Sequence, residues 1–381
     1  MAGPRILVVS PIPSHPADQG NSARIQALGH QLKQRGAVAD FFYYGMEGLS
    51  EGQRATMSAF WNRFHFMPSQ ALAKQRFATC WGLDDWCPAE LVEAVRKVFV
   101  AGRYDAVVVN YVWMSRILEG IEGAVRILDT HDLFGDRHLI SQRTGLEPRW
   151  FFTSATEEDR GFARADIVIG IQDAESAIIR RRFGGTVLTV GYPMAPRFLT
   201  DDLPAEPPLM FGYLGSGNPW NVRSIGALDT ALALEGQHAE GRMDWAIAGT
   251  ILRRNPDYAS RPMRLGVLPT VDQFYQKVRC VLNPMLGGTG LKIKTVEALA
   301  YGRATIGTED AFVGLPARHP AHRLTDMAGM VAVMRDYQRS VALRQELLDA
   351  SMGLYLDYLA HVGGEYDQLV KACGGDFRDA A

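Results

Sequence analysis

Short apolar runs alternate with amphipathic stretches along almost the whole chain. In the first half, helical spacing of apolar residues predicts helices over residues 21–35 and 90–100. The remaining runs have the length of buried strands and lie at residues 5–10, 38–44, 106–112, 126–130, 167–171 and 187–190. Near-continuous aliphatic runs separated by helices are typical of parallel strands covered on both faces. We therefore predict a doubly wound α/β domain over residues 1–195.

A proline-rich segment interrupts this alternation, which then restarts. Residues 196–208 hold four prolines and two adjacent aspartates, so we predict a linker there. Beyond it, strands are predicted at residues 209–214, 245–248, 265–268, 279–283 and 304–307, and helices at 221–234, 271–278, 289–301 and 340–372. The predicted fold class is α/β, with two Rossmann-like doubly wound domains facing a cleft. The second domain spans residues 209–350, and a helical tail over 351–381 is a candidate to pack back on the first.

Length and composition agree with two soluble domains. A chain of 381 residues exceeds one ordinary core, and 47% hydrophobic with 22% charged residues is an ordinary globular composition. The net charge of −2 gives no overall attraction to nucleic acid or anionic lipid, so we expect no nucleic-acid partner. The four cysteines show no zinc-type spacing and are expected to be reduced thiols.

The sequence shows no pattern typical of secretion or of a membrane span. The first apolar run, Ile6 to Val9, is too short for the core of a signal peptide. No segment approaches the ~20 apolar residues that a membrane span needs. We expect a cytoplasmic protein, with peripheral contact to the inner face of the membrane left open.

The most informative stretch runs from Asn283 to Gly302, and we call it the glycine–lysine segment. An apolar run ends where it begins, a glycine-rich turn follows, and the next predicted helix opens with two lysines. The glycines, lysines and single carboxylate are Gly287, Gly288 and Gly290, Lys292 and Lys294, and Glu297. Helix N-termini bind anions because their first N–H groups lack partners and the helix dipole is positive there. This order suits the pyrophosphate and ribose of a nucleotide sugar; the alternative is a surface turn with an ordinary Lys294–Glu297 ion pair.

Spacing excludes two commoner nucleotide motifs. Walker A requires a lysine directly after the second glycine of G-x-x-x-x-G, which the glycine–lysine segment lacks. The strand, turn and helix at residues 209–223 contain a Gly-x-Gly turn but lack the third glycine of a dinucleotide fingerprint. This turn can still bring backbone N–H groups to a phosphate, and its candidate residues are Gly215, Ser216, Asn221 and Arg223. The alternative is a structural turn in which Asn221 caps the helix.

In the first domain, a long loop leads into a predicted helix at Gly20, Asn21 and Ser22. The start of a helix attracts anions, so these three residues are candidates for contact with an acceptor or a phosphate. Arg24 in the same helix is as well explained as a solvated helix charge.

His131 lies at the end of a predicted strand, beside Asp129 and Asp132. A histidine there can donate to a sugar hydroxyl or to developing charge, and we take it as a candidate catalytic residue. Together with Asp136 the two aspartates could also bind a hard cation, but nothing supplies the remaining ligands. We therefore expect no metal site.

Taken together, these segments resemble the GT-B glycosyltransferases of the retaining family 4 type (glycosyl transferases group 1). The resemblance covers nearly the whole chain. It is most specific over Gly288–Thr308, which is similar to the family's donor-binding helix and following strand, and it extends to Pro219–Ile225 and Asp129–Asp132. It implies transfer of a hexose-type sugar from a nucleoside diphosphate sugar to an acceptor hydroxyl with retention, in polysaccharide or glycoconjugate biosynthesis. It implies no metal or other cofactor, and as acceptor a saccharide, a lipid-linked molecule or a protein.

The resemblance also implies roles for the glycine–lysine segment. Glu297 matches the second glutamate of the family's E-x7-E motif, which holds the ribose hydroxyls, whereas Thr289 stands at the first position of that motif. Backbone N–H groups from Thr289 through Gly290 to Leu291 would then make more of the contact with sugar and phosphate.

The pyrophosphate-binding arginine and lysine of the family have no clear counterpart. Ser216 stands near the arginine position, and Asn221 or Arg223 near the lysine position. We assign the positive charge to Lys294, with Lys292 as the second candidate. His131 matches the family histidine near the hydroxymethyl group of the donor sugar.

Two other functions remain open. A nucleotide-sugar 2-epimerase shares this architecture but needs further acid–base groups around the sugar. A non-catalytic nucleotide-sugar-binding subunit is compatible with Thr289 and with the missing arginine and lysine.

Overall fold

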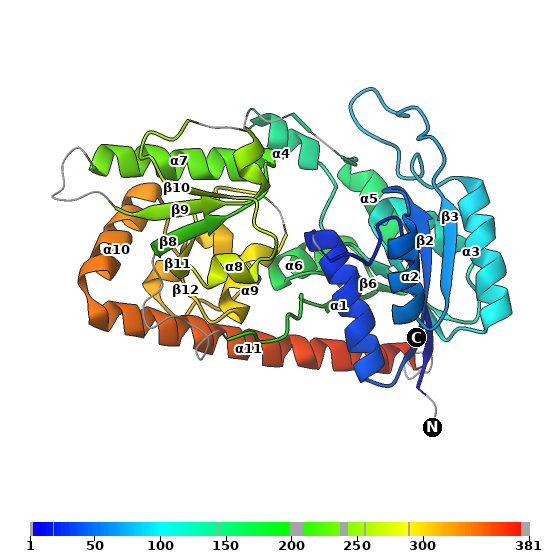
Figure 1. Cartoon of the computed structure of the whole chain (residues 1–381). Coiled ribbons are helices and arrows are strands. Elements are labelled where there is room, and N and C mark those ends of the chain that lie inside the picture. The colour runs from blue at the N-terminus through cyan, green and yellow to red at the C-terminus, as the bar shows by residue number, and fades with distance from the viewer. Residues whose placement is uncertain are drawn as a thin grey trace. The chain divides into compact units, whose positions relative to one another are not determined.

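The computed structural model describes residues 3–17, 19–143, 145, 147–148, 150–198, 209–236, 243–254, 257–288 and 290–374. The chain forms two compact units, Met1–Tyr192 with Val362–Ala381, and Pro193–His361 (Figure 1). The predicted linker at 196–208 lies outside the described residues except for 196–198. Each unit contains its own parallel sheet.

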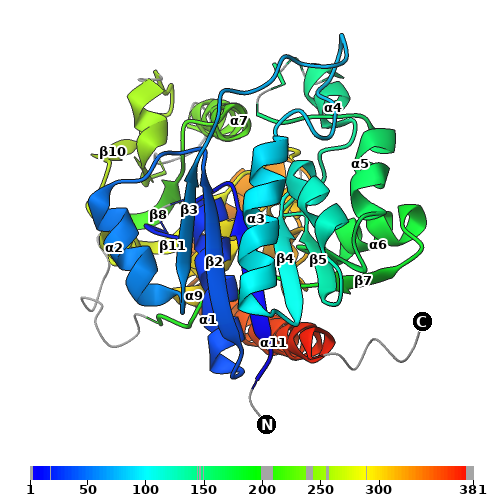
Figure 2. The ribbon, with the colours of Figure 1, turned by 90° about the vertical axis from the view of Figure 1, so that its right-hand side faces the viewer.

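The first unit is built on a seven-stranded sheet in the order β3-β2-β1-β4-β5-β6-β7 (Figure 2). All neighbouring strands are parallel. The strands are β1 (Arg5–Ser10), β2 (Val38–Gly45), β3 (Phe64–Pro68), β4 (Ala106–Asn110), β5 (Val125–Asp129), β6 (Ile167–Gly170) and β7 (Thr186–Thr189). The chain runs outward from β1 in both directions, so the topological switch point lies between β1 and β4.

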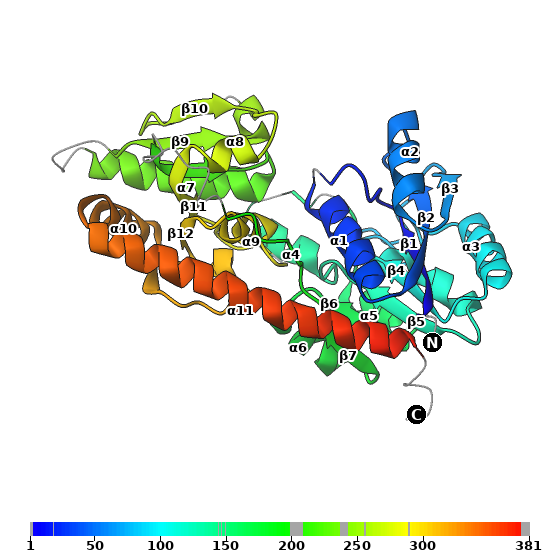
Figure 3. The ribbon, with the colours of Figure 1, turned by 60° about the horizontal axis from the view of Figure 1, so that its bottom comes forward.

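Helices connect these strands, as expected for a doubly wound sheet. They are α1 (Gly20–Gln34), α2 (Glu51–Phe60), α3 (Ala89–Gly102), α4 (Arg137–Arg143), α5 (Ala155–Phe162) and α6 (Asp173–Arg182), with a 3-10 helix at Val112–Gly120. The long helix α11 (Val341–Cys373) begins in the second unit and ends in the first (Figure 3). Within the first unit, Arg35 at the end of α1 donates to the carbonyl oxygen of Gly363 at 2.8 Å and to Asp367 Oδ1 at 2.6 Å, which fixes the last turns of α11.

The second unit is built on a five-stranded parallel sheet in the order β10-β9-β8-β11-β12. The strands are β8 (Leu209–Leu214), β9 (Trp245–Ala248), β10 (Met263–Gly266), β11 (Val278–Asn283) and β12 (Ala304–Gly307). The helices are α7 (Pro219–Glu235), α8 (Asp272–Tyr275), α9 (Ile293–Ala300), α10 (Met327–Arg339) and the first part of α11, with 3-10 helices at Thr250–Arg254, Glu309–Phe312 and Pro320–His322. The structure therefore confirms two Rossmann-like α/β folds.

The alternation of side chains along β8 explains the packing of this sheet. Phe211 and Tyr213 point into a core that also contains residues of α7 and α10. Gly212 points to the opposite face, where a Cβ would lie 2.4 Å from Val278 and 2.9 Å from the ring of Phe274. Glycine is thus required there because α8 packs directly against the strand.

Several predicted boundaries are wrong for identifiable reasons. The strand predicted at 106–112 ends at Asn110, because the backbone turns at Tyr111 with φ 72°. The helix predicted at 271–278 is only α8, since Val278 already pairs with Leu209 of β8. The strand predicted at 265–268 lies two residues earlier. The helix predicted from residue 289 begins at Ile293, so only one of the two lysines lies within α9. The elements that were not predicted include strand β3 and helices α2, α4, α5, α6 and α10.

The cysteines and most of the tryptophans are buried in the structure. All four cysteines are free and buried. Trp61, Trp86 and Trp113 are at most 5% exposed, so these three aromatic residues serve the core. No helix within the described ranges is long and apolar enough to cross a membrane.

Candidate functional site

The switch point of the second sheet lies between β8 and β11, because the chain continues from β8 to β9 on one side and from β11 to β12 on the other. Ligands of open α/β sheets bind at the carboxyl ends of the strands at this point. The loops that follow the two strands there are residues 215–218 and 284–292. The predicted donor-site residues lie in these loops or in α7 and α9, the helices that follow them.

A helix cap organises the loop after β8. The side chain of Asn218 accepts the backbone N–H of Asn221 at 2.8 Å and so caps α7. The prediction that Asn221 could be the cap is therefore wrong. Its side chain instead donates to the carbonyl and hydroxyl oxygens of Ser216, each at 3.1 Å. Gly215 lies in close backbone contact with the loop after β9, since a Cβ at Gly249 would be 2.3 Å from the carbonyl oxygen of Gly215.

The loop after β11 depends on its glycines. Gly287, Gly288 and Gly290 have φ values of 74°, 87° and 74°, in the left-handed region that favours glycine. A side chain at Gly287 would also lie 2.8 Å from the ring of Trp220 in α7. The loop is therefore shaped by backbone freedom and by close packing on α7. Thr289, a predicted donor contact, lies outside the described residues.

Lys292 stabilises this loop from within. Its ammonium donates to the carbonyl oxygen of Gly290 at 2.8 Å and to that of Gly288 at 3.4 Å, and its side chain is nearly buried. Leu291 beside it is also buried, whereas Arg223 is exposed on α7. Lys292 therefore stabilises the loop after β11 through hydrogen bonds to its carbonyl oxygens. Arg223 is exposed to solvent and does not contact this loop in any described hydrogen bond or ion pair.

Lys294, in the first turn of α9, contacts residues on both sides of the loop after β8, in β8 and in α7. Its Nζ donates to Asn221 Oδ1 at 2.7 Å and to the hydroxyl of Tyr213 at 3.3 Å, and lies 4.9 Å from the centre of the Tyr213 ring. No carboxylate of the described residues forms an ion pair with it. Burial, and then the charge of Lys292, lower the pKa of Lys294 to about 7. The alternative ion pair with Glu297 is not formed.

Glu297 lies one turn further along α9 and has different partners. Tyr275 of α8 donates its hydroxyl to Glu297 Oε2 at 3.0 Å. The ring of Tyr275 stacks on that of Tyr301, with centroids 4.1 Å apart and planes inclined by 15°. Burial raises the pKa of Glu297, and the hydrogen bond from Tyr275 and the charge of Arg197 oppose that rise.

The first unit has a second polar cluster at the carboxyl edge of its sheet. Arg24 donates to Asp129 Oδ1 at 2.8 Å, and both side chains are only 3% exposed. Arg24 also donates to the carbonyl oxygen of Val190 at 3.0 Å. Burial alone would raise the pKa of Asp129, but the Arg24 guanidinium holds it below its usual value. Arg24 is thus a buried ion-pair partner, and its interpretation as a solvated charge is wrong.

His131 follows this ion pair in a left-handed conformation, with φ 60°. Its ring stacks on Tyr111 at a centroid distance of 4.3 Å, and its Nε2 lies 3.7 Å from Asp129 Oδ2. Burial lowers the pKa of His131 to about 4, so the imidazole is neutral near pH 7. A neutral ring offers one donor and one acceptor, which suits the contact with a sugar hydroxyl predicted for it.

The three residues predicted at the start of α1 have different surroundings, and their contact with an acceptor or a phosphate stays a prediction. The side chain of Asn21 hydrogen-bonds that of Tyr111 and so joins the His131 cluster. Ser22 forms a capping box with Gln19 and donates to its carbonyl oxygen at 3.0 Å, so its hydroxyl serves the helix. Gly20 is the exposed first residue of α1.

The three aspartates weighed as a metal site have separate partners. Asp129 pairs with Arg24, and Asp132 with Arg137 at 3.1 Å. Asp136 accepts the backbone N–H of Ala155 at 3.3 Å.

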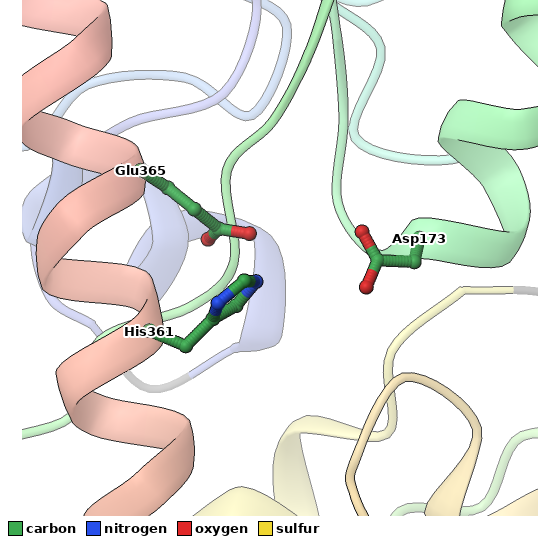
Figure 4. Close-up of side chains that lie close together, drawn as sticks. All are labelled: Asp173, His361 and Glu365. Carbon is green, nitrogen blue, oxygen red and sulfur yellow. The ribbon is translucent and has the colours of Figure 1, made fainter.

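Figure 4 shows two further carboxylates of the first unit, Asp173 at the start of α6 and Glu365 on α11, one turn after His361. Glu365 accepts the N–H of Gly191 at 2.8 Å, and Asp173 accepts the hydroxyl of Thr189 at 3.0 Å. These bonds explain the two carboxylates as parts of the fold of the first unit.

Sequence reasoning missed several members of both clusters. Three tyrosines contact predicted site residues: Tyr213 contacts Lys294, Tyr275 contacts Glu297, and Tyr111 stacks on His131. No motif marks these tyrosines. Their positions follow from strand order and helix packing, and only Tyr213 could have been suspected, because it is the second-last residue of β8 before the loop.

No protein-family model matches the chain, and no curated protein matches it in sequence. Solved structures match over nearly the whole chain. Sucrose-phosphate synthase from Thermosynechococcus elongatus is 15% identical, with a TM-score of 0.61, over 97% of this chain and 100% of that chain. HepE from Anabaena, in complex with UDP and glucose, is 12% identical, with a TM-score of 0.64, over 97% and 100%. The pneumococcal O-GlcNAc transferase GtfA, in complex with UDP and GlcNAc, is 9% identical, with a TM-score of 0.64, over 98% and 99%. The chain therefore has the GT-B glycosyltransferase fold.

Proposed function

We propose that the protein is a glycosyltransferase that moves a hexose-type sugar from a nucleoside diphosphate sugar to an acceptor hydroxyl with retention of configuration. The proposal rests mainly on the surroundings of Lys294, whose ammonium has neutral hydrogen-bond partners. A buried ammonium normally pairs with a carboxylate, because burial without a counter-charge is costly. Among the residues that the structure describes, Lys294 is bound by a neutral amide and a phenol, at the switch point between two strands. A diphosphate would supply the missing negative charge.

The surrounding groups support a donor with this chemistry. The left-handed glycines bring the backbone of the loop after β11 close to a ligand, and the start of α9 favours anions. Glu297 lies one turn deeper and can accept hydrogen bonds from ribose hydroxyls. HepE and GtfA are described in complex with UDP and a sugar, which makes UDP-sugars the first donors to try.

The proposed chemistry is electrostatic. Lys294 and the N–H groups of the loop after β11 stabilise the leaving diphosphate, and neutral His131 contacts the donor sugar. The oxygen of the leaving phosphate accepts the proton of the acceptor hydroxyl on the same face of the sugar, which gives retention. The bond from the anomeric carbon to the phosphate breaks as the bond to the acceptor oxygen forms. No protein nucleophile is required.

We place this reaction in polysaccharide or glycoconjugate biosynthesis, on the cytoplasmic side, with a saccharide, lipid-linked or protein acceptor and without a metal. Peripheral contact with the membrane would suit a lipid-linked acceptor. Separation of the protein from cell membranes by washing at high salt would test that contact.

The function is tested in two stages. Thermal unfolding is measured with UDP, GDP and ADP, and a ligand present at 100 times its Kd should stabilise the fold by about 2.7 kcal/mol. The corresponding nucleotide sugars are then incubated with and without acceptors, and the products are examined by NMR. We expect release of nucleoside diphosphate and a product that keeps the anomeric configuration of the donor.

Each other outcome has a distinct meaning. An epimerised nucleotide sugar formed without acceptor would identify a 2-epimerase. Stabilisation with neither transfer nor slow donor hydrolysis would identify a binding subunit. If no nucleotide or nucleotide sugar changes the unfolding temperature, the donor site itself is wrong.

A further inference from the structure

The environment of Glu297 contains a feature that the proposed function does not use. Tyr275 is 1% exposed, and its only described side-chain hydrogen bond is the one that it donates to Glu297 Oε2. Burial raises the pKa of the Tyr275 hydroxyl well above its usual value, so it remains a donor at all physiological pH values. Among the described residues, no donor is bound to the other carboxylate oxygen, Oε1. One oxygen is thus fixed by the protein, and the other is left for a ligand.

Tyr275 is itself held rigidly. Its ring stacks on Tyr301, whose hydroxyl donates to Asp272 Oδ1 at 2.7 Å and accepts from Arg197 at 3.0 Å. The carbonyl oxygen of Tyr275 accepts the Arg303 Nε at 2.8 Å. A buried aromatic ring with contacts on its face, hydroxyl and backbone has one accessible rotamer, which makes it a precise support for another side chain.

If Glu297 were only structural, its role would be to accept the hydrogen bond of the buried Tyr275 hydroxyl. That role does not require a carboxylate. A neutral amide would accept the same hydrogen bond without the desolvation that raises the pKa of Glu297. Glu297 is ionisable, lies on the same helix as Lys294, and has one oxygen with no donor among the described residues. A ligand that needs a strong hydrogen-bond acceptor explains these features better.

We propose that Tyr275 is a positioning residue that orients the Glu297 carboxylate toward the ribose hydroxyls of the donor nucleotide. This inference rests on the proposed donor site. Tyr275 does not touch the donor. It selects the rotamer of Glu297, and its hydrogen bond favours the ionised carboxylate, which accepts strongly from a ribose diol.

The groups around Glu297 fix the expected effect of pH. Tyr275 and Asp272 face it from α8, Arg197 from the segment before β8, and Tyr301 from the end of α9. Removal of the Tyr275 hydroxyl deletes a contact that lowers the pKa of Glu297. The carboxylate should then take up its proton at a higher pH, and donor affinity should be lost earlier on acidification.

The test compares Tyr275→Phe with Tyr258→Phe. Tyr258 is buried in the same unit, and its hydroxyl has no hydrogen-bond partner among the described residues, so it controls for the loss of a buried hydroxyl. The probe is whichever of UDP, GDP and ADP stabilises the wild type most, and binding is followed by calorimetry between about pH 4.5 and 8. We expect Tyr275→Phe to weaken binding about three- to tenfold and to move the acid limb to higher pH. Tyr258→Phe should change neither. In turnover, KM for the donor should rise while kcat is kept.

Two further measurements separate positioning from structure. In the Glu297→Ala background, Tyr275→Phe should cause no further loss of affinity, because the two residues act through one interaction. A 2′,3′-dideoxynucleoside diphosphate should bind the wild type and Tyr275→Phe equally. Unchanged affinity and pH profile in Tyr275→Phe, or additive losses in the double variant, would overturn the inference while leaving the donor site intact. If no nucleoside diphosphate binds the wild type, the proposed function fails, and this inference fails with it.

Discussion

Each unit has a positive side chain near the carboxyl edge of its parallel sheet whose surroundings can be compared, Arg24 in the first and Lys294 in the second. In the first unit, Arg24 is neutralised by Asp129 at 2.8 Å, and both groups are buried. In the second, the hydrogen bonds of Lys294 within the described part of the chain go to Asn221 and Tyr213, which are both neutral. The first arrangement is electrostatically complete within the protein. The second has no counter-charge among the described residues, and it is the place where we propose that the diphosphate binds.

The largest effect is expected from the removal of Arg24, whose charge is already paired within the protein. Arg24→Met leaves the buried Asp129 carboxylate without its positively charged partner, which should destabilise the fold by about 3–5 kcal/mol. Chemical denaturation measures the loss. The double variant Arg24→Met/Asp129→Asn should recover much of it, since no uncompensated charge remains. A single variant as stable as the wild type would mean that the ion pair contributes little.

Removal of the Lys294 charge should have the opposite effect, because it should lower ligand affinity and leave the stability of the fold unchanged or slightly higher. Lys294→Met keeps the length and apolar stem of the side chain, so stability should be retained or slightly increased. Affinity for the diphosphate should fall by about 1.5–3 kcal/mol, roughly 10- to 100-fold, because a charge-assisted hydrogen bond is lost. Calorimetry with a nucleoside diphosphate, beside thermal unfolding of the free protein, checks both. Arg223→Met, exposed on α7, serves as the control, and equal losses in both variants would contradict a specific role for Lys294.

The smallest effect concerns pH. A pKa of about 7 for Lys294 means that the protonated fraction falls about threefold between pH 6.5 and pH 7.5. Affinity for a nucleoside diphosphate sugar, whose diphosphate does not titrate in this range, should fall by the same factor as pH rises, with proton uptake on binding. In the free protein the sign is reversed, since a lysine whose pKa is lowered by folding makes the fold more stable as pH rises above 7. A Lys294→Met variant with the same pH dependence as the wild type would assign the effect to another group.

The structure confirms the order of strand, turn and helix in the glycine–lysine segment, whereas the roles of its residues stay predictions. The glycine turn, the following helix and its charged residues are contiguous, so their order on a strand–turn–helix unit could be predicted. The division of roles between Lys292 and Lys294 could not. Two residues separate them, yet one turns back to the carbonyl groups of its own loop and the other reaches α7. That difference depends on where α9 begins, which the sequence placed four residues too early.

The sequence by itself determined the alternation of strands and helices, the two parallel sheets and the clustering of glycine and positive charge, because these follow from periodicity, turn propensity and adjacency in the chain. The tertiary structure decided which charges are compensated. Arg24 meets Asp129 across 105 residues, and Lys294 meets Asn221 across 73. Such contacts depend on strand order and on the packing angles of helices, which a single sequence does not encode in any local pattern. The fold was therefore predictable, whereas the electrostatic difference between the two sheet edges was visible only in three dimensions.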